Sequence, residues 1–112
     1  MLIEFDKLEK EIVPHMRGGE KQVTLERFID PMNKIIRGRL IPGATIGLHT
    51  HDDGCEIIYI LSGKGRILYD DGCEPLEAGS CHFCPKGHTH SLINDSPEGG
   101  EDLCFFAVVA EQ

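Results

Sequence analysis

Two histidines and a glutamate near the middle of the chain have the residue types and the spacing of a metal site. His49 and His51 are two positions apart, and side chains at positions i and i+2 of a β-strand project from the same face. The turn sequence Asp52-Asp53-Gly54 follows, and a chain reversal there returns Glu56 to a position beside the two imidazoles. Two nitrogens and one carboxylate oxygen are therefore expected to converge.

A later stretch offers His90 as a fourth ligand. It follows Pro85 and Gly87, and the pair favours a turn that aims the next strand, because proline fixes φ near −65° and glycine permits positive φ. Burying three imidazoles and a carboxylate in an apolar interior costs free energy unless a cation or a dense hydrogen-bond network satisfies them. We therefore expect one metal ion per chain at these four side chains.

The ligand chemistry narrows the choice of metal. Three nitrogens and one oxygen suit divalent Mn, Fe, Co, Ni, Cu or Zn, whereas calcium prefers sites built from oxygen alone. The sequence leaves the choice among the transition metals open.

Two further histidines have a weaker claim to this site. His88 lies two residues before His90, so it either reaches a bound ligand or lies exposed at the rim of the site, and we favour exposure. His82 either lines the cavity or is a polar residue satisfied by its neighbours, and we favour the second interpretation.

Two arginines and two tyrosines are also candidates. Arg37 and Arg39 share one face of a predicted strand and would hold a substrate carboxylate if that face lined the cavity; we favour solvated surface positions. The hydroxyls of Tyr59 and Tyr69 could serve an active site, but most strand tyrosines pack with one polar end in water.

The elements around these residues are predicted to be almost entirely β-strands. Short runs rich in Ile, Val, Leu, Phe and Tyr alternate with Gly and Pro breaks. The predicted strands cover residues 22–29, 34–41, 45–49, 55–61, 65–69, 80–85, 89–94 and 102–110. Eight strands suit a small closed barrel or two-sheet jelly roll. Only residues 5–12 show helical spacing, enough for a short helix or turn.

The last predicted strand is apolar on both faces. Leu103, Phe105 and Ala107 alternate with Cys104 and Phe106, so one face is buried inside and the other needs a cover. We expect a homodimer, in which the segment before Lys34 packs across the sheet of its partner.

Length and charge limit the class of protein. A chain of 112 residues fits one compact domain, which we divide into an N-terminal arm with the first strand (1–33) and a barrel core (34–112). With 19 acidic and 11 basic residues the net charge is −8, which argues against a nucleic-acid partner. We find no signal peptide or membrane-spanning run, so a cytoplasmic location without membrane association is expected.

The cysteines fit that location. There are five, an odd number that does not suit a secreted disulfide framework, so we expect free thiols. Cys81 and Cys84 form a CxxC pair, but a second pair to complete a zinc site is missing, and we interpret them as small side chains on a strand.

The two histidine-containing stretches resemble the two sequence motifs of the cupin family. The matching positions are Gly43, His49, His51, Glu56, Gly63, Gly79, Pro85, Gly87, His90 and Asn94, and they span about half of the chain. The resemblance implies an all-β cupin fold, a double-stranded β-helix that forms a jelly-roll-like barrel. It also implies that His49, His51, Glu56 and His90 are the metal ligands, with coordination positions left open to water or substrate.

The resemblance leaves two functions open. The chain is similar to short bacterial single-domain cupins of the oxalate-decarboxylase-like group, but oxalate decarboxylases hold the substrate carboxylate with an arginine where this chain has Ile46. One interpretation is a metalloenzyme (dioxygenase, isomerase, lyase or decarboxylase) that acts on a small polar or carboxylate-bearing molecule. The alternative is a non-catalytic module that binds or senses a small ligand, and no catalytic residue can be assigned from the sequence.

Overall fold

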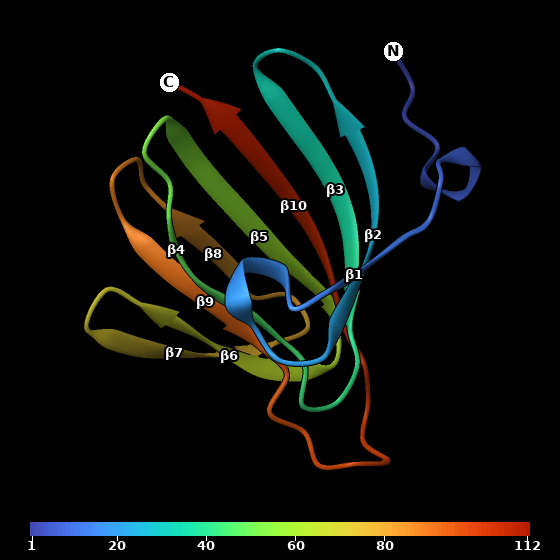
Figure 1. Ribbon diagram of the computed structural model, residues 1–112, viewed down its shortest axis with the longest axis vertical. Coiled ribbons are helices and arrows are strands. Elements are labelled where there is room, and N and C mark those ends of the chain that lie inside the picture. Colours follow the sequence, from blue (N-terminus) through green and yellow to red (C-terminus); the bar gives the residue numbers. More distant parts are fainter.

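Ten β-strands form two antiparallel sheets in the computed structural model, which describes residues 1–112. The six-stranded sheet has the order β1 (Glu11–Pro14), β2 (Gln22–Ile29), β3 (Asn33–Leu40), β10 (Leu103–Glu111), β5 (Gly54–Ser62) and β8 (Cys81–Cys84). The four-stranded sheet has the order β4 (Thr45–Thr50), β9 (Thr89–Ile93), β6 (Lys64–Tyr69) and β7 (Gly72–Glu77). The two sheets face each other (Figure 1), so the prediction of an all-β two-sheet fold is confirmed.

All eight predicted strands form, and no predicted end differs from the observed one by more than one residue. Two strands were missed. A short helix or turn was predicted in residues 5–12, and the 3-10 turn η1 (Phe5–Lys7) forms there, but the end of this range belongs to β1, which pairs with β2. Strand β7 contains Pro75 and has only Leu76 buried, so it lacks the apolar alternation that identifies strands.

The core lies between the sheets and is formed by fourteen buried apolar residues. Leu40, Ile60, Ile67 and Leu103 are fully buried within it, as expected for side chains that alternate inward from facing strands. Asn94 is also fully buried, and its Nδ2 donates to the carbonyl oxygens of Leu40 and Glu101 at 2.9 and 3.0 Å. Asn94 therefore joins the end of β3 to the loop before β10, and its amide is fully hydrogen-bonded without a ligand.

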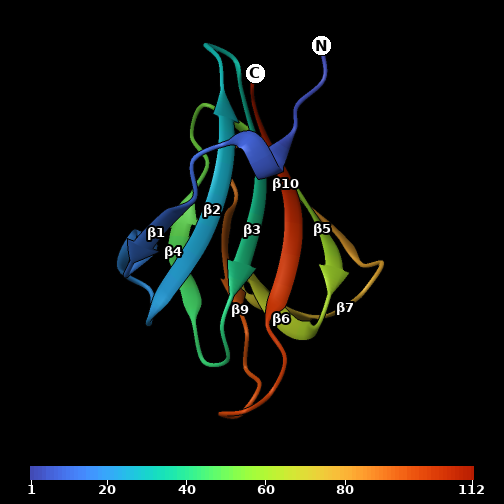
Figure 2. The ribbon, with the colours of Figure 1, turned by 90° about the vertical axis from the view of Figure 1, so that its right-hand side faces the viewer.

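The N-terminal arm covers part of the outer face of the six-stranded sheet. The ring of Phe5 contacts Phe106 of β10 edge to face, with centroids 6.2 Å apart, and Figure 2 shows η1 lying against β10 and β3. Within one chain the arm thus packs on its own sheet, and its packing across a partner's sheet stays a prediction. The arm supplies the cover that the outer face of β10 requires.

Arg37 belongs to this outer face and is no candidate for substrate binding. Its guanidinium pairs with Glu26 and, at 2.6 Å, with Asp6 of the arm, and it lies 5.3 Å from the centroid of the Phe5 ring. Arg39 lies 3.8 Å from Asp102 with more than half of its side chain exposed. Both arginines occupy surface positions, as we favoured from the sequence.

Strands β5 and β8 expose a further apolar patch on the same face, consisting of Ile57, Tyr59, Leu61 and Phe83. Each of these side chains is more than 40% exposed, and the two strands are hydrogen-bonded neighbours. Tyr59 therefore faces outward, away from the interior.

None of the helices in the fold has the length and hydropathy to span a membrane.

We predict that a second copy of the chain covers this patch. Phe83→Glu places a charge in the apolar patch and should convert a dimer to a monomer at micromolar concentration, because burying an unpaired carboxylate is costly. Light scattering after size-exclusion chromatography measures the mass. Leu48→Glu, an exposed apolar position on β4 of the other sheet, is the matched control and should leave the mass unchanged. A monomeric wild type would contradict the prediction.

Candidate metal centre

The four predicted ligands come from both sheets and meet at one end of the interior. His49 on β4 and His90 on β9 are directly paired across neighbouring strands. His51 follows β4, where its carbonyl oxygen accepts from the Gly87 amide at 2.6 Å. Gly87 has a φ of +87°, a conformation that glycine adopts without strain. Glu56 reaches the site from β5 of the opposite sheet.

The ligand atoms lie close to one another. Nε2 of His51 is 3.0 Å from both His90 Nε2 and Glu56 Oε1. Nε2 of His90 is 3.1 Å from His49 Nε2 and 2.8 Å from Glu56 Oε1. His90 and Glu56 are buried, and the other two ligands are partly buried. The convergence that strand periodicity predicted is therefore present.

Hydrogen bonds at the far side of two rings fix their tautomers. The Nδ1 of His49 lies 2.7 Å from the carbonyl oxygen of Gly47, so it carries the proton and donates. The Nδ1 of His82 donates to Glu74 Oε1 at 2.8 Å, which leaves His82 Nε2 to accept from His90 Nδ1 at 3.1 Å. In the neutral rings, the Nε2 atoms of His49 and His90 therefore both present lone pairs.

This arrangement fits a metal ion. The lone pairs of His49 and His90 point at each other across 3.1 Å with a carboxylate oxygen beside them, and such groups repel one another unless a cation lies between them. Ligating histidines usually donate their other N–H to a carbonyl or carboxylate, as His49 does directly and as His90 does through His82 to Glu74. A divalent transition metal is the cation that this donor set suits.

The ionisation of Glu56 supports the same conclusion. Burial opposes the charged form, but the imidazoles of His51 and His90 beside the carboxylate outweigh it and hold the pKa of Glu56 at about 2. Burial is also the main cause that lowers the pKa of His49 below the ordinary value of 6.5. At neutral pH the site therefore contains a carboxylate and a neutral His49, the forms that bind metal.

A second group of potential ligands, His82, Cys84 and His90, shares one member with the first. Its two imidazoles already satisfy each other through the N–H···N hydrogen bond. Burial raises the pKa of the Cys84 thiol to about 11 in the metal-free site, so there it is a neutral thiol. His82 therefore supports the first group of ligands by holding the ring of His90, and we do not treat the second group as a separate metal site.

A cavity of about 100 Å³ adjoins the ligands between the two sheets. Its inner wall is apolar and includes Ile36, Ile46, Leu92 and Phe105. Strand β4 is irregular in register between Ile46 and His49, and both side chains line the cavity although they are three positions apart. Ile46 therefore occupies a position from which an arginine could have reached a ligand.

The mouth of the cavity carries positive charge. The remaining polar lining consists of Arg17, Arg27 and Lys34. A wider hollow of about 300 Å³ lies outside and shares Arg17, Lys34, His51 and Val109 with the cavity. Sequence reasoning had not connected these three cations with the site, because they lie in or near the arm, far from the histidine motifs along the chain.

The other sequence candidates lie outside the ligand cluster. His88 is half exposed and donates to Asp70 at 2.7 Å, with its ring stacked on Tyr69 at a centroid distance of 5.6 Å; the favoured exposed interpretation is confirmed. His82 is satisfied by its neighbours, as we favoured, but one of them is His90. Its partner Glu74 was missed because it lies on β7, which the sequence pattern did not reveal.

The five cysteines are all free.

Comparisons with known proteins agree with this geometry. The cupin domain family matches residues 37–106. An oxalate-binding protein of Thermotoga maritima is 34% identical over 116 residues, which cover 97% of this chain and 93% of that protein. The crystal structure of a predicted oxalate decarboxylase from Thermotoga maritima is 30% identical, covers both chains completely and superposes with a TM-score of 0.91.

A more distant structure shares the fold alone. The polyketide cyclase RemF from Streptomyces resistomycificus is 21% identical and superposes with a TM-score of 0.78 over 98% of this chain and 78% of its own.

We predict that His82→Ala lowers the affinity for Zn²⁺ or Mn²⁺ by about 10- to 100-fold, because His90 loses the acceptor that orients its ring. Titration against a chromophoric chelator measures the affinity. His88→Ala removes a neighbouring histidine that contacts no ligand and is the matched control. Equal affinities in the two variants would show that His82 does not support the site.

Acidification should destabilise the metal-free protein in two stages. His49 has a folded-state pKa below 6.5, so the stability it contributes is present above pH 6.5 and is lost as the pH falls through that lowered value. Glu56 contributes stability above pH 4.5 that is lost as the pH falls towards about 2. Urea unfolding at several pH values measures this, with Glu56→Gln as the variant that lacks the second stage. A wild type whose stability is constant from pH 7 to pH 3 would contradict it.

Proposed function

This chain belongs to the cupin family, and on that premise we propose that it binds a small carboxylic acid at one divalent transition metal held by His49, His51, Glu56 and His90. One observation carries the proposal. The four ligand residues line a cavity whose only other polar side chains are cationic. A carboxylate oxygen satisfies both the metal and the cations.

The size of the cavity limits the ligand. A volume of about 100 Å³ is small beside the roughly 300–1,000 Å³ of common ligand pockets, which suits an acid of a few heavy atoms. Oxalate is of this size, and the relative from Thermotoga maritima is named an oxalate-binding protein. Its 34% identity over nearly the whole chain supports a ligand of the same class here.

The number of protein ligands supports direct binding to the metal. Four ligands complete a tetrahedral site, but they leave two positions vacant around Mn or Fe, which prefer six. When bound, such a metal supplies Lewis-acid stabilisation of negative charge on a ligand oxygen. The side chains of this chain orient the acid and exclude water from its inner side through the apolar wall.

A metalloenzyme is the second candidate function, favoured by the same open cavity. Apart from the four ligands, the titratable side chains of the cavity are Arg17, Arg27 and Lys34. No carboxylic acid, tyrosine or further histidine lines it as a proton donor or acceptor. The lining therefore supports binding more strongly than acid–base catalysis.

Calorimetric titration of oxalate into Mn²⁺-loaded protein tests the proposal. We expect binding of one oxalate per bound metal and no heat from the metal-free protein. His51→Ala should lose metal and oxalate binding together while the barrel stays folded, because the apolar core does not depend on this residue. His88→Ala is the matched control and should retain both.

Two results would change the assignment. Binding of oxalate without metal, or a metal-loaded protein indifferent to every small acid, would contradict the proposal. Conversion of oxalate into formate and carbon dioxide in the same sample would favour the enzyme over the binding module.

A further inference from the structure

Arg17 is the only arginine of the chain without an acidic partner. The chain has five arginines, and the other four form ion pairs. Arg27, which lines the same cavity, donates two hydrogen bonds to Glu11 at 2.9 and 2.6 Å, so its charge is already balanced. Lys34 has neither an ion pair nor a side-chain hydrogen bond, so the free positive charge of the cavity comes from Arg17 and Lys34.

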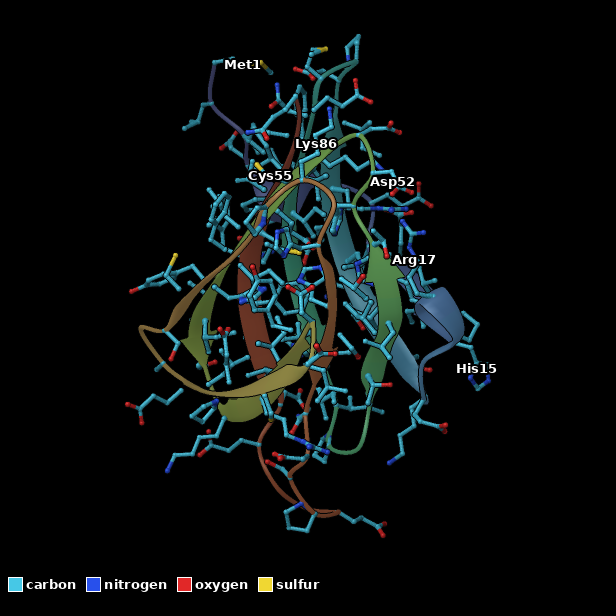
Figure 3. The ribbon with its side chains drawn as sticks, turned by 90° about the vertical axis from the view of Figure 1, so that its left-hand side faces the viewer. Met1, His15, Arg17, Asp52, Cys55 and Lys86 are labelled. Carbon is cyan, nitrogen blue, oxygen red and sulfur yellow. The ribbon has the colours of Figure 1, made fainter.

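These two side chains reach the entrance from different elements of the fold. Arg17 belongs to η2 (Met16–Gly18), which packs on β4, whereas Lys34 lies at the start of β3 in the six-stranded sheet. Both line the inner cavity and the outer hollow, so they stand where the two join. Figure 3 shows Arg17 beside β4, on the same side as Asp52, while His15 points away from the barrel.

The backbone holds Arg17 in this place at a conformational cost. Its φ of 57° and ψ of 28° are left-handed, a region that non-glycine residues rarely adopt and that is frequent at functional sites. Nothing in the turn itself requires an arginine there, because Gly18 has the same handedness and a glycine would serve. His15 and Lys21 in the same segment are also left-handed, so the backbone strain marks this turn, and the role of Arg17 rests on its place in the cavity lining.

Two glycines press this turn against the metal-binding strand. A Cβ at Gly47 would collide with the carbonyl oxygen of Arg17, and a Cβ at Gly19 would collide with the carbonyl oxygen of Thr45. The Gly47 carbonyl is also the group that accepts from Nδ1 of His49. Arg17 is thereby fixed directly behind the first metal ligand.

We propose that Arg17, assisted by Lys34, binds the outer carboxylate of a short dicarboxylate whose inner oxygens face the metal site. This inference rests on the proposed function and narrows its ligand class. The guanidinium fork pairs with a carboxylate through two parallel hydrogen bonds, which an apolar side chain cannot do. Ile46 on β4 provides no such group, and Arg17 supplies it from the arm.

None of the acidic residues of the outer hollow forms a direct ion pair with Arg17 or Lys34. Asp30 accepts hydrogen bonds from the backbone amides of Met32 and Asn33, so its carboxylate is engaged in its own turn. Asp52, Asp53 and Glu111 also line the hollow, but none forms an ion pair with Arg17 or Lys34. A dianion that reaches the metal site therefore encounters two unpaired cations.

Calorimetry with oxalate, malonate and acetate on Mn²⁺-loaded protein tests the inference. The wild type should prefer the two dicarboxylates to acetate. Arg17→Ala should weaken oxalate binding by at least about tenfold, the effect of losing a charged hydrogen-bond pair, and should remove the preference over acetate, with metal content unchanged. Lys34→Ala should weaken oxalate binding by a smaller factor. Arg66→Ala, which removes an equal charge at an exposed pair with Asp95, is the matched control.

Arg17→Gly separates recognition from structure. Glycine relieves the left-handed strain, so this variant should unfold at the same temperature as the wild type or higher while losing the same tenfold in oxalate affinity. If Arg17→Ala, Arg17→Gly and Arg66→Ala all bind oxalate like the wild type, the inference is wrong and the proposed function stands. If the metal-loaded wild type binds no acid at all, both are wrong.

Discussion

Three imidazole nitrogens and a carboxylate oxygen lie within 4.8 Å of one another inside an apolar barrel, and the strands around them are arranged to keep them there. Neutral imidazoles at this distance do not attract one another when both present lone pairs, as His49 and His90 do. Their convergence is maintained by the surrounding strands and by hydrogen bonds to the opposite ring nitrogens. A cation in the centre converts this repulsion into coordination.

The two sheets hold these ligands together because each sheet contributes part of the set. One sheet supplies the three histidines from neighbouring strands, and the other supplies Glu56 across the interior. The chain Glu74–His82–His90 then runs from the surface edge of β7 through β8 to β9. Each of these side chains is hydrogen-bonded to the next. The buried imidazoles therefore have no donor or acceptor left unpaired.

The N-terminal arm contacts both sheets. Its first part covers the outer face of β10 through Phe5, and its second part places the turn of Arg17 against β4. Glycines at both contact points allow backbone to touch backbone, which a side chain on either strand would prevent. The arm thus contributes to the outer packing of the barrel and to the charge at the cavity mouth.

The sequence by itself determined the features that arise from local periodicity and turn chemistry. Alternation predicted eight strands, and the His49, His51 and Glu56 spacing predicted the convergence of ligands, because residues two apart on a strand must share a face. Only the tertiary structure revealed β1 and β7, which have no regular apolar alternation and are held by hydrogen bonds to the neighbouring strands β2 and β6. It alone placed Glu74 and His82 behind His90 and Arg17 at the cavity. These contacts cross between different strands and turns, and strand order and register set them while local residue preference does not.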